Sequence, residues 1–319
     1  MTELKNEVSL KAIALDTGGT MTDSFLIDQE GSFSVGKAIT TPDDESIGIL
    51  NSIQDALTQW NSTLEDSGKT VDALVYSGTA MLNKLLERKG NSKIGVIVNA
   101  GFEDTLRLGR ALQCWIWLDY GGRLHAREHE HPKPIIPRKQ IKGVRGRINF
   151  WGEELIPLYR DEVTKAAEEL LDMGMECIVI SLLCSYMNPR HEKQAKRAVG
   201  KVIKKRGLDI PVIISSEQMP VRGETPRLNG LVIEQYAAEP SREMMIHISE
   251  KFKEKGIPAP LRILTTYGGT VSPTHKQLIT TMMSGPIGGM IGTKFLAKEY
   301  GIQNLVSSDV GGTSFDVGL

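Results

Sequence analysis

The chain has 319 residues, 40% hydrophobic and 24% charged, which is enough to build two ordinary domains with hydrophobic cores and argues against disorder. Lys plus Arg (38) and Asp plus Glu (39) nearly cancel to a net charge of -1, which excludes a general electrostatic attraction to nucleic acid or anionic lipid. The charged N-terminus, the lack of a membrane-length apolar run and three cysteines without a C-x-x-C pair predict a reduced, cytoplasmic protein that is neither exported nor inserted in a membrane.

The first ninety residues predict a β-rich start that gives way to helices. Residues 11–16 and 21–28 are strand-like runs on either side of a TGGT turn, which predicts a β-hairpin, and residues 31–39 continue in extended form. Apolar residues then recur at helical spacing over residues 45–60. A strand-like run at 71–78 follows, and after it a helical pattern.

The rest of the chain continues this alternation. Apolar, β-branched runs that predict strands occur at 93–101, 176–186, 210–216 and 262–266. Helical patterns occur at 160–174, 189–207, 227–256 and 284–301. Strands that alternate with helices predict an α/β fold with a largely parallel sheet covered on both faces. We place a domain boundary between Lys205 and Pro211, which divides the chain into residues 1–207 and 208–319.

The segment from Leu112 to Val144 interrupts this rhythm. It contains CWIWLDYGG and a run with three prolines, and it has no lasting period. We expect a long irregular excursion of the kind that often serves as a binding or interface loop.

The stretch LDTGGTMTD at residues 15–23 has the composition of a phosphate-binding turn. Two adjacent glycines allow positive φ and let an anion approach the backbone N–H groups, and threonine hydroxyls add donors. A carboxylate at the strand end is a poor phosphate contact, but it can hold Mg²⁺ directly or through water. The candidates are Asp16, Gly18, Gly19 and Thr20, with Thr17, Thr22 and Asp23 in support. The structural alternative is a plain Gly-Gly hairpin turn flanked by β-prone threonines.

A second copy of the pattern favours the phosphate-binding interpretation over a plain hairpin turn. SSDVGGTSFD, which ends at residue 316, repeats the Asp, both Gly, the Thr and the later Asp at identical spacing, again after an apolar run. Two such loops that face one another could clamp a polyphosphate and its metal from both sides. The second set of candidates is Asp309, Gly311, Gly312 and Thr313.

Paired D-x-G-G-T hairpins resemble the phosphate loops of the actin, sugar kinase and Hsp70 ATPase superfamily. In that superfamily a small-residue helix precedes the second loop, and SGPIGGMIGTKF at 284–295 stands in that place. The whole chain resembles the hydantoinase A and oxoprolinase family, through LDTGGTMTDSFLID, YSGTAMLNKLLERKG, PVRGETPRLN, EQYAAEPSR, TYGGT, MSGPIGGMIG and SDVGGTSFDV in that order. Within the family, the sequence is most similar to the β subunits of acetone carboxylases.

The resemblance implies an actin-like, ribonuclease-H-like ATPase core, with the first half complete and the second half begun. It implies ATP and Mg²⁺ as cofactors, with Asp16 and Asp309 as the catalytic and metal-binding carboxylates. The activity implied is that of a nucleotide-binding subunit in an ATP-dependent hetero-oligomeric ketone carboxylase, which converts acetone and bicarbonate to acetoacetate through phosphorylated intermediates. No general base is identified by the sequence.

Two other functions stay open at this point. One is ATP-dependent hydrolysis of a cyclic amide of the hydantoin or 5-oxoproline type by the same phosphate machinery. The other is an inactive fragment or interaction module, because superfamily order places the adenosine-binding segment after the second phosphate loop. We therefore expect the 319 residues to be the N-terminal part of a longer subunit and to bind ATP weakly or not at all.

Two further glycine-containing turns are candidates for a substrate cleft. Gly78 and Thr79 lie between a strand and a helix, where Thr79 could cap the helix or leave N–H groups free for an anion. Gly268 and Gly269 follow the strand RILTT and are either part of the cleft or a simple turn.

Structural interpretations are favoured for the remaining motifs. His125, His129 and His131 could bind a metal, but the neighbouring prolines and charges favour a solvated surface. The basic run at 196–207 is typical of an exposed helix face rather than a nucleic-acid site, since it lacks aromatic residues. Trp115, Trp117, Cys177 and Cys184 are expected to be core or interface residues.

Overall fold

The computed structural model describes residues 8–108, 114–115, 118–129, 131, 133–312 and 315–319, which form two compact units. Unit 1 combines Met1–Lys89 with Ala237–Leu319, and unit 2 is Gly90–Tyr236. Each unit has its own main sheet, so two sheets replace the single parallel sheet that the alternation of strands and helices predicts. The domain boundary predicted between Lys205 and Pro211 lies within unit 2, and the division at residue 207 stays a prediction.

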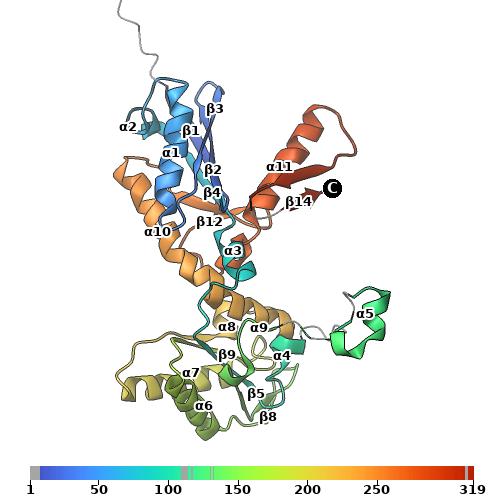
Figure 1. The fold of residues 1–319 in the computed structure, drawn as a ribbon. Coiled ribbons are helices and arrows are strands. Elements are labelled where there is room, and N and C mark those ends of the chain that lie inside the picture. Colours follow the sequence, from blue (N-terminus) through green and yellow to red (C-terminus); the bar gives the residue numbers. More distant parts are fainter. Residues whose placement is uncertain (1–7, 109–113, 116–117, 130, 132, 313–314) are drawn as a thin grey trace, which may run out of the picture. The chain divides into compact units, whose positions relative to one another are not determined.

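Unit 1 begins with a three-stranded meander and ends with a separate hairpin (Figure 1). Its strands are β1 (Leu10–Thr17), β2 (Met21–Asp28), β3 (Phe33–Ile39), β4 (Ala73–Gly78), β11 (Leu261–Leu264), β12 (Thr270–Val271), β13 (Ser307–Val310) and β14 (Phe315–Gly318). Its α-helices are α1 (Glu45–Thr58), α2 (Leu64–Ser67), α3 (Ala80–Leu86), α10 (Glu239–Glu254) and α11 (Ser284–Glu299).

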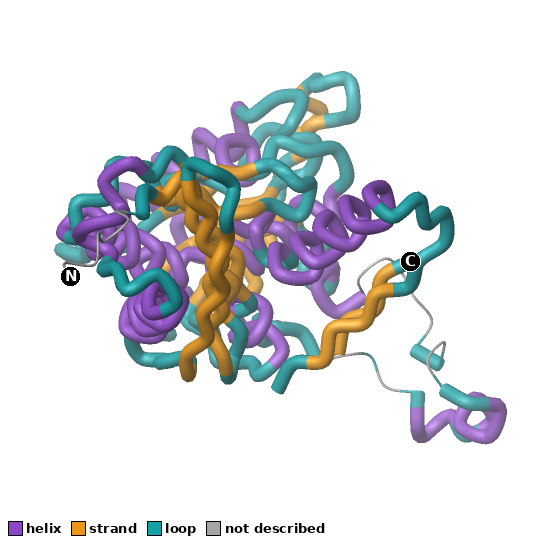
Figure 2. Tube along the Cα trace, turned by 90° about the horizontal axis from the view of Figure 1, so that it is seen from above, coloured by secondary structure: helices purple, strands orange, loops and turns teal. Residues whose placement is uncertain are grey.

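The main sheet of unit 1 has the order β12-β11-β4-β1-β2-β3. It is mixed, because β1, β2 and β3 follow one another through tight turns and pair antiparallel, while β4 pairs parallel with both β1 and β11. The predicted TGGT hairpin is therefore present as β1 and β2. Figure 2 shows the second hairpin, β13 with β14, as a pair of strands apart from this sheet.

Alternation along β1 decides which side chains face the core. Ile13, Leu15 and Thr17 are buried, whereas Ala14 and Asp16 lie on the other face. Helix α1 packs closely on β3 at Gly36, where an added Cβ would lie 1.9 Å from the Ser52 carbonyl oxygen. The carboxylate of Asp16 is thus directed away from the helix-covered core of unit 1.

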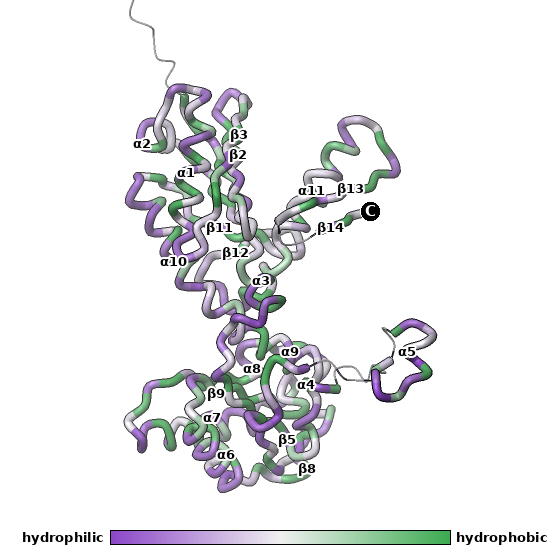
Figure 3. The backbone as a smooth tube through the Cα atoms, viewed as in Figure 1, coloured by the Kyte–Doolittle hydropathy of each residue, from purple (hydrophilic) through white to green (hydrophobic). Residues whose placement is uncertain are grey.

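Unit 2 contains a four-stranded parallel sheet with the order β10-β9-β5-β6. Its strands are β5 (Ile94–Asn99), β6 (Ile141–Val144), β7 (Arg147–Ile148), β8 (Glu154–Ile156), β9 (Cys177–Ser181) and β10 (Val212–Ile214). Its α-helices are α4 (Thr105–Leu108), α5 (Tyr120–Leu124), α6 (Arg160–Asp172), α7 (Arg190–Lys205), α8 (Ser215–Gln218) and α9 (Glu224–Ile233). Apolar side chains of α6 and α7 form one core with the sheet, and Figure 3 shows hydrophilic segments along the outer parts of these helices.

Two predicted boundaries in unit 2 were wrong. The run 176–186 is a strand only to Ser181, because the N–H groups of Leu182 and Leu183 donate to the side chains of Glu192 and Asn99 instead of to a neighbouring strand. The excursion predicted for 112–144 ends in a regular strand, β6, whose partner is β5. In the described part of the chain, every helix is too short or too polar to cross a lipid bilayer.

Candidate functional site

Asp16 lies at the end of β1, between two neighbouring strands. It is opposite Asp23 of β2 and beside Ser77 of β4 in the strand register. The Ser77 hydroxyl donates a hydrogen bond to Asp16 Oδ1 at 3.0 Å. Asp23 is itself paired with Lys37 of β3, 2.5 Å away. Strand pairing therefore places an oriented carboxylate on the open face of the sheet.

The surroundings make a negative charge on Asp16 unfavourable. Loss of hydration raises the pKa of Asp16 above its ordinary value, and the carboxylates of Asp23 and Asp309 raise it further. The hydrogen bond from Ser77 and the charge of Lys37 oppose these effects and keep the pKa from rising more. The residue is nevertheless exposed to solvent. A cation bound here would relieve the repulsion among these carboxylates, so the donor set fits a metal ion.

Two hydrogen bonds to neighbouring backbone and side-chain groups hold the turn after Asp16 in place. The Gly18 N–H donates to the Met21 carbonyl at 2.9 Å, and the Thr40 hydroxyl donates to the Gly18 carbonyl at 2.9 Å. Thr22 is fully buried, and its hydroxyl lies 3.0 Å from that of Thr40. The hydroxyl of Thr22 thus braces the turn from the protein side instead of pointing into solvent.

The Gly-Gly turn exposes two backbone N–H groups. Neither Gly18 nor Gly19 adopts the positive φ that glycine allows, and an added Cβ on Gly18 would lie 3.1 Å from the Met21 carbonyl oxygen. Gly19 and Thr20 are exposed, and in the described part of the chain their N–H groups donate to no other residue. These two N–H groups are consequently available to an anion.

The second hairpin reproduces the register of the first. Asp309 is opposite Asp316 in β13 and β14, as Asp16 is opposite Asp23 in β1 and β2. An added Cβ on Gly312 would lie 2.3 Å from the hydroxyl oxygen of Thr20, so the two turns meet. The structure therefore brings together two motifs almost three hundred residues apart. Thr313, the remaining candidate of the second loop, lies outside the described residues.

Helix α11 begins beside the same carboxylate. The buried hydroxyl of Ser284 accepts a hydrogen bond from the Gly78 N–H at 3.2 Å and donates one to the Gly78 carbonyl at 3.3 Å. An added Cβ on Gly285 would lie 3.5 Å from Asp16 Oδ1. No local sequence pattern indicates these hydrogen bonds of Ser284, although the motif MSGPIGGMIG that contains it is prominent.

The two proposed cleft turns have structural explanations. Gly78 accommodates the Tyr76 hydroxyl, which would lie 2.4 Å from an added Cβ. Thr79 occupies the N-cap position of α3 but makes no capping bond to the backbone; its hydroxyl accepts from the Asn83 amide at 3.2 Å. Gly268 has φ +83° in the turn between β11 and β12, and Gly269 closes that turn through Thr265. Their contact with substrate stays a prediction.

Mg²⁺ is the metal that the carboxylates near the turns would suit. Among the residues that the structure describes, no three His, Cys, Asp or Glu side chains converge on one point as metal ligands. Phosphate-bound Mg²⁺ keeps several waters and takes only one or two protein carboxylates, which Asp16 and Asp309 could supply.

The other sequence candidates are distributed over unit 2. The imidazole of His129 lies 3.0 Å from the Arg123 carbonyl and packs against Trp115. Trp117 lies outside the described residues. Cys177 and Cys184 are buried thiols that form no disulfide within the described residues, as predicted, and burial raises the pKa of Cys184.

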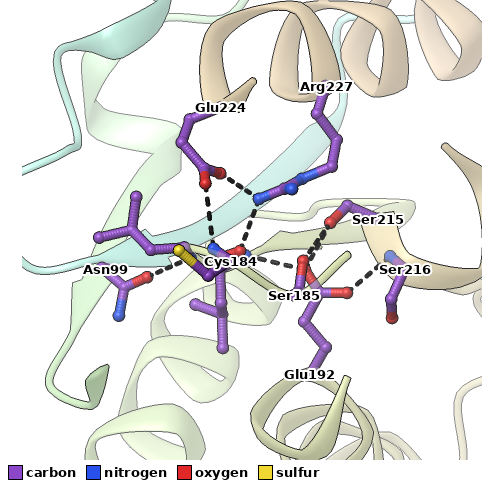
Figure 4. A network of polar contacts seen from close by, with 10 residues as sticks. Asn99, Cys184, Ser185, Glu192, Ser215, Ser216, Glu224 and Arg227 are labelled. Carbon is purple, nitrogen blue, oxygen red and sulfur yellow. Dashed lines mark hydrogen bonds and ion pairs between the residues drawn. The ribbon is translucent and has the colours of Figure 1, made fainter. Parts of the chain in front are cut away.

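A buried polar network at the carboxyl ends of β5, β9 and β10 was not predicted (Figure 4). The Glu192 carboxylate accepts from the Leu182 and Ser216 N–H groups and from the Ser215 hydroxyl. Glu224 accepts from the Cys184 N–H and from the guanidinium of buried Arg227. These bonds fix the loop after β9, where Cys184 has the uncommon φ of +56°. Sequence pattern offers no signal for a network joined by such separated residues.

Comparison with known protein families assigns this chain to one of them. Residues 12–203 match the hydantoinase/oxoprolinase N-terminal region, and residues 227–319 match the hydantoinase/oxoprolinase domain. The chain belongs to the hydantoinase/oxoprolinase family. The resemblance inferred from the sequence motifs is thereby confirmed.

Two curated members of the hydantoinase/oxoprolinase family align along nearly the whole chain. The acetone carboxylase beta subunit of Xanthobacter autotrophicus is 45% identical over 98% of this chain and 43% of its own length. The acetophenone carboxylase gamma subunit of Aromatoleum aromaticum is 33% identical over 100% of this chain and 43% of its own length. The chain thus spans less than half the length of these relatives, both of which are named as subunits.

A solved member of the family has the same fold. The nucleotide-free structure of acetone carboxylase, described as an ATP-dependent enzyme, superposes with a TM-score of 0.90 at 44% identity and covers 98% of this chain and 44% of that one. The α/β, actin-like ATPase core expected from the sequence is confirmed.

Proposed function

We propose that this chain carries the phosphate-binding loops of a nucleotide-binding subunit in an ATP-dependent ketone carboxylase. The observation that carries the proposal is the meeting of two hairpins in identical register at Thr20 and Gly312, with Asp16 and Asp309 close enough to influence one another. Similarity to subunits of acetone and acetophenone carboxylases supports ketone and bicarbonate as the substrates. By analogy the product from acetone is acetoacetate, and other subunits complete the enzyme.

In this proposal the two turns hold the ATP phosphates. The exposed N–H groups of Gly19 and Thr20 donate to phosphate oxygens from one side, and Gly311 and Gly312 let the second turn approach from the other. Thr22 contributes indirectly, because its buried hydroxyl holds Thr40 under Gly18.

The carboxylates have a different task. Asp16, oriented by Ser77, and Asp309 would hold Mg²⁺ directly or through water. When bound, Mg²⁺ supplies positive charge that offsets the charge on the transferring phosphoryl group. The protein's own contribution is positioning, since transfer to an enolate or bicarbonate oxygen asks little covalent chemistry of its side chains.

Phosphate release by the purified multi-subunit enzyme that contains this chain tests the proposal. We expect release to require ATP, acetone and bicarbonate together. Release that instead depends on hydantoin or 5-oxoproline would replace the carboxylase with a cyclic amide hydrolase, the second activity of this family. An assembled complex that responds to neither substrate set would make the chain an interaction module.

A further inference from the structure

Helices α6 and α7 of unit 2 enclose a surface groove. The two helices pack side by side over the parallel sheet, and a depression of about 440 Å³ runs between them. Its charged lining residues are Arg160 and Glu168 of α6 and Arg197, Lys201 and Lys205 of α7. The groove belongs to unit 2 alone, whereas Asp16 and both phosphate turns belong to unit 1.

The groove is strongly basic. Four of its lining residues are cations, Glu168 is its one carboxylate, and all four cations are exposed. Two neighbouring cations outside the groove are neutralised, since Lys196 pairs with Glu217 at 2.7 Å and Arg206 with Asp172 at 2.6 Å. Within the described residues, Arg160, Arg197, Lys201 and Lys205 make no such ion pair. Among the residues that the structure describes, the groove itself thus carries four unpaired cations against one carboxylate.

The cations are arranged at a regular interval. Arg197, Lys201 and Lys205 follow one another every four residues along α7, and so recur about every 6 Å along one side of the groove. Alternate residues of an extended peptide are about 6.6 to 6.8 Å apart. Val202 is buried and Ala198 is partly buried beneath them, which provides an apolar floor.

We propose that this groove docks an extended acidic segment of a partner protein, with alternate carboxylates paired to the α7 cations and small side chains on the floor. The observations favour a peptide over a nucleic acid. No aromatic side chain lines the groove for base stacking, and Glu168 would repel a continuous polyanion. The chain as a whole has a net charge of -1, which gives no general attraction to nucleic acid.

Fluorescence anisotropy with the 319-residue chain tests the proposal. The probe is a fluorescein-labelled peptide of about twelve residues in which Glu alternates with Ala; the comparison probes replace each Glu by Gln or are thymidine oligonucleotides of equal charge. We expect only the Glu peptide to bind well. Its binding should weaken when salt rises to about 0.5 M, because exposed ion pairs are screened.

Matched variants locate the site. Arg197→Gln with Lys201→Gln should weaken Glu-peptide binding about tenfold, since each exposed ion pair is individually weak. Lys193→Gln with Lys204→Gln removes the same charge from the same helix outside the groove, and its affinity should stay within about twofold. Circular dichroism checks that both variants fold.

Three results would overturn the proposal. The first is equal weakening by the two pairs of substitutions, which would indicate a general charge effect. The second is binding of the Gln peptide as tight as that of the Glu peptide, or no binding of the Glu peptide. The third is tighter binding of the oligonucleotide, which would make the groove a polyphosphate site. None of these results depends on carboxylase activity.

Discussion

The substitution Asp16→Asn tests whether the Asp16 carboxylate contributes to phosphate transfer or to the stability of the fold. The change removes a negative charge opposite Asp23. Facing side chains on paired strands are about 5 Å apart, and two exposed charges at about 6 Å repel by about 0.7 kcal/mol in water. Lys37 and dissolved salt reduce this gain. The hydrogen bond from Ser77 weakens by about 1 kcal/mol when its acceptor becomes neutral.

These contributions nearly cancel. Urea denaturation should therefore give Asp16→Asn a free energy of unfolding within about 1 kcal/mol of that of the unaltered chain. Phosphate release by the assembled enzyme should fall by about a hundredfold or more. The reason is that the substitution removes a carboxylate proposed to hold the metal ion, which offsets negative charge in the transition state. Asp72→Asn, an exposed carboxylate of unit 1 remote from the turns in sequence, serves as the control for charge loss. A loss of more than about 2 kcal/mol would show a structural role for Asp16, and near-normal turnover would remove it from the metal site.

Three further experiments test buried contacts in the structure. Ser284→Ala leaves the buried Gly78 N–H without its partner, and urea denaturation should show a loss of about 1 to 3 kcal/mol; an unchanged midpoint would contradict the hydrogen-bond assignment. Gly36→Ala drives a Cβ into the Ser52 carbonyl and should cost about 3 kcal/mol or more, whereas Gly200→Ala, which meets nothing within 4 Å in α7, should add about 0.5 to 1 kcal/mol. Burial raises the pKa of Glu45, which accepts from Tyr76 at 2.7 Å, so the folded chain holds this proton more tightly than the unfolded chain. The contribution of Glu45 to stability should therefore fall as pH rises above about 4.5 toward the raised pKa. The unfolding free energies of the unaltered chain and of Glu45→Gln, measured from pH 3.5 to 7, should differ in this pH dependence. The same pH dependence in both proteins would refute the prediction.

Local features of the site follow directly from the sequence. Identical spacing in D-x-G-G-T-x-x-D gives two hairpins of identical register, because a turn of fixed length between two strand-like runs fixes which residues pair. The positions of Asp16 and Asp309 at the strand ends follow from the same rule. Gly18 and Gly19 do not use the positive φ that glycine allows.

Distant partners decide where the strand β9 ends and where the Thr22 hydroxyl is directed. The strand at 177–181 has the composition to continue, but Glu192 and Asn99 capture the next two N–H groups. Thr22 has a hydroxyl suited to phosphate, yet Thr40 holds it in the core. In both cases a side chain from elsewhere in the chain competes with the local preference, and a local pattern carries no information about that competitor.

The amino-acid sequence by itself determined the two hairpins, the alternation of strands and helices, and the family to which the chain belongs. Only the tertiary structure decided that Thr20 meets Gly312 and that Ser284 is bonded to Gly78, 206 positions away. The reason is physical: turns and registers depend on neighbouring residues, whereas contacts between remote segments depend on how whole elements pack over their shared cores.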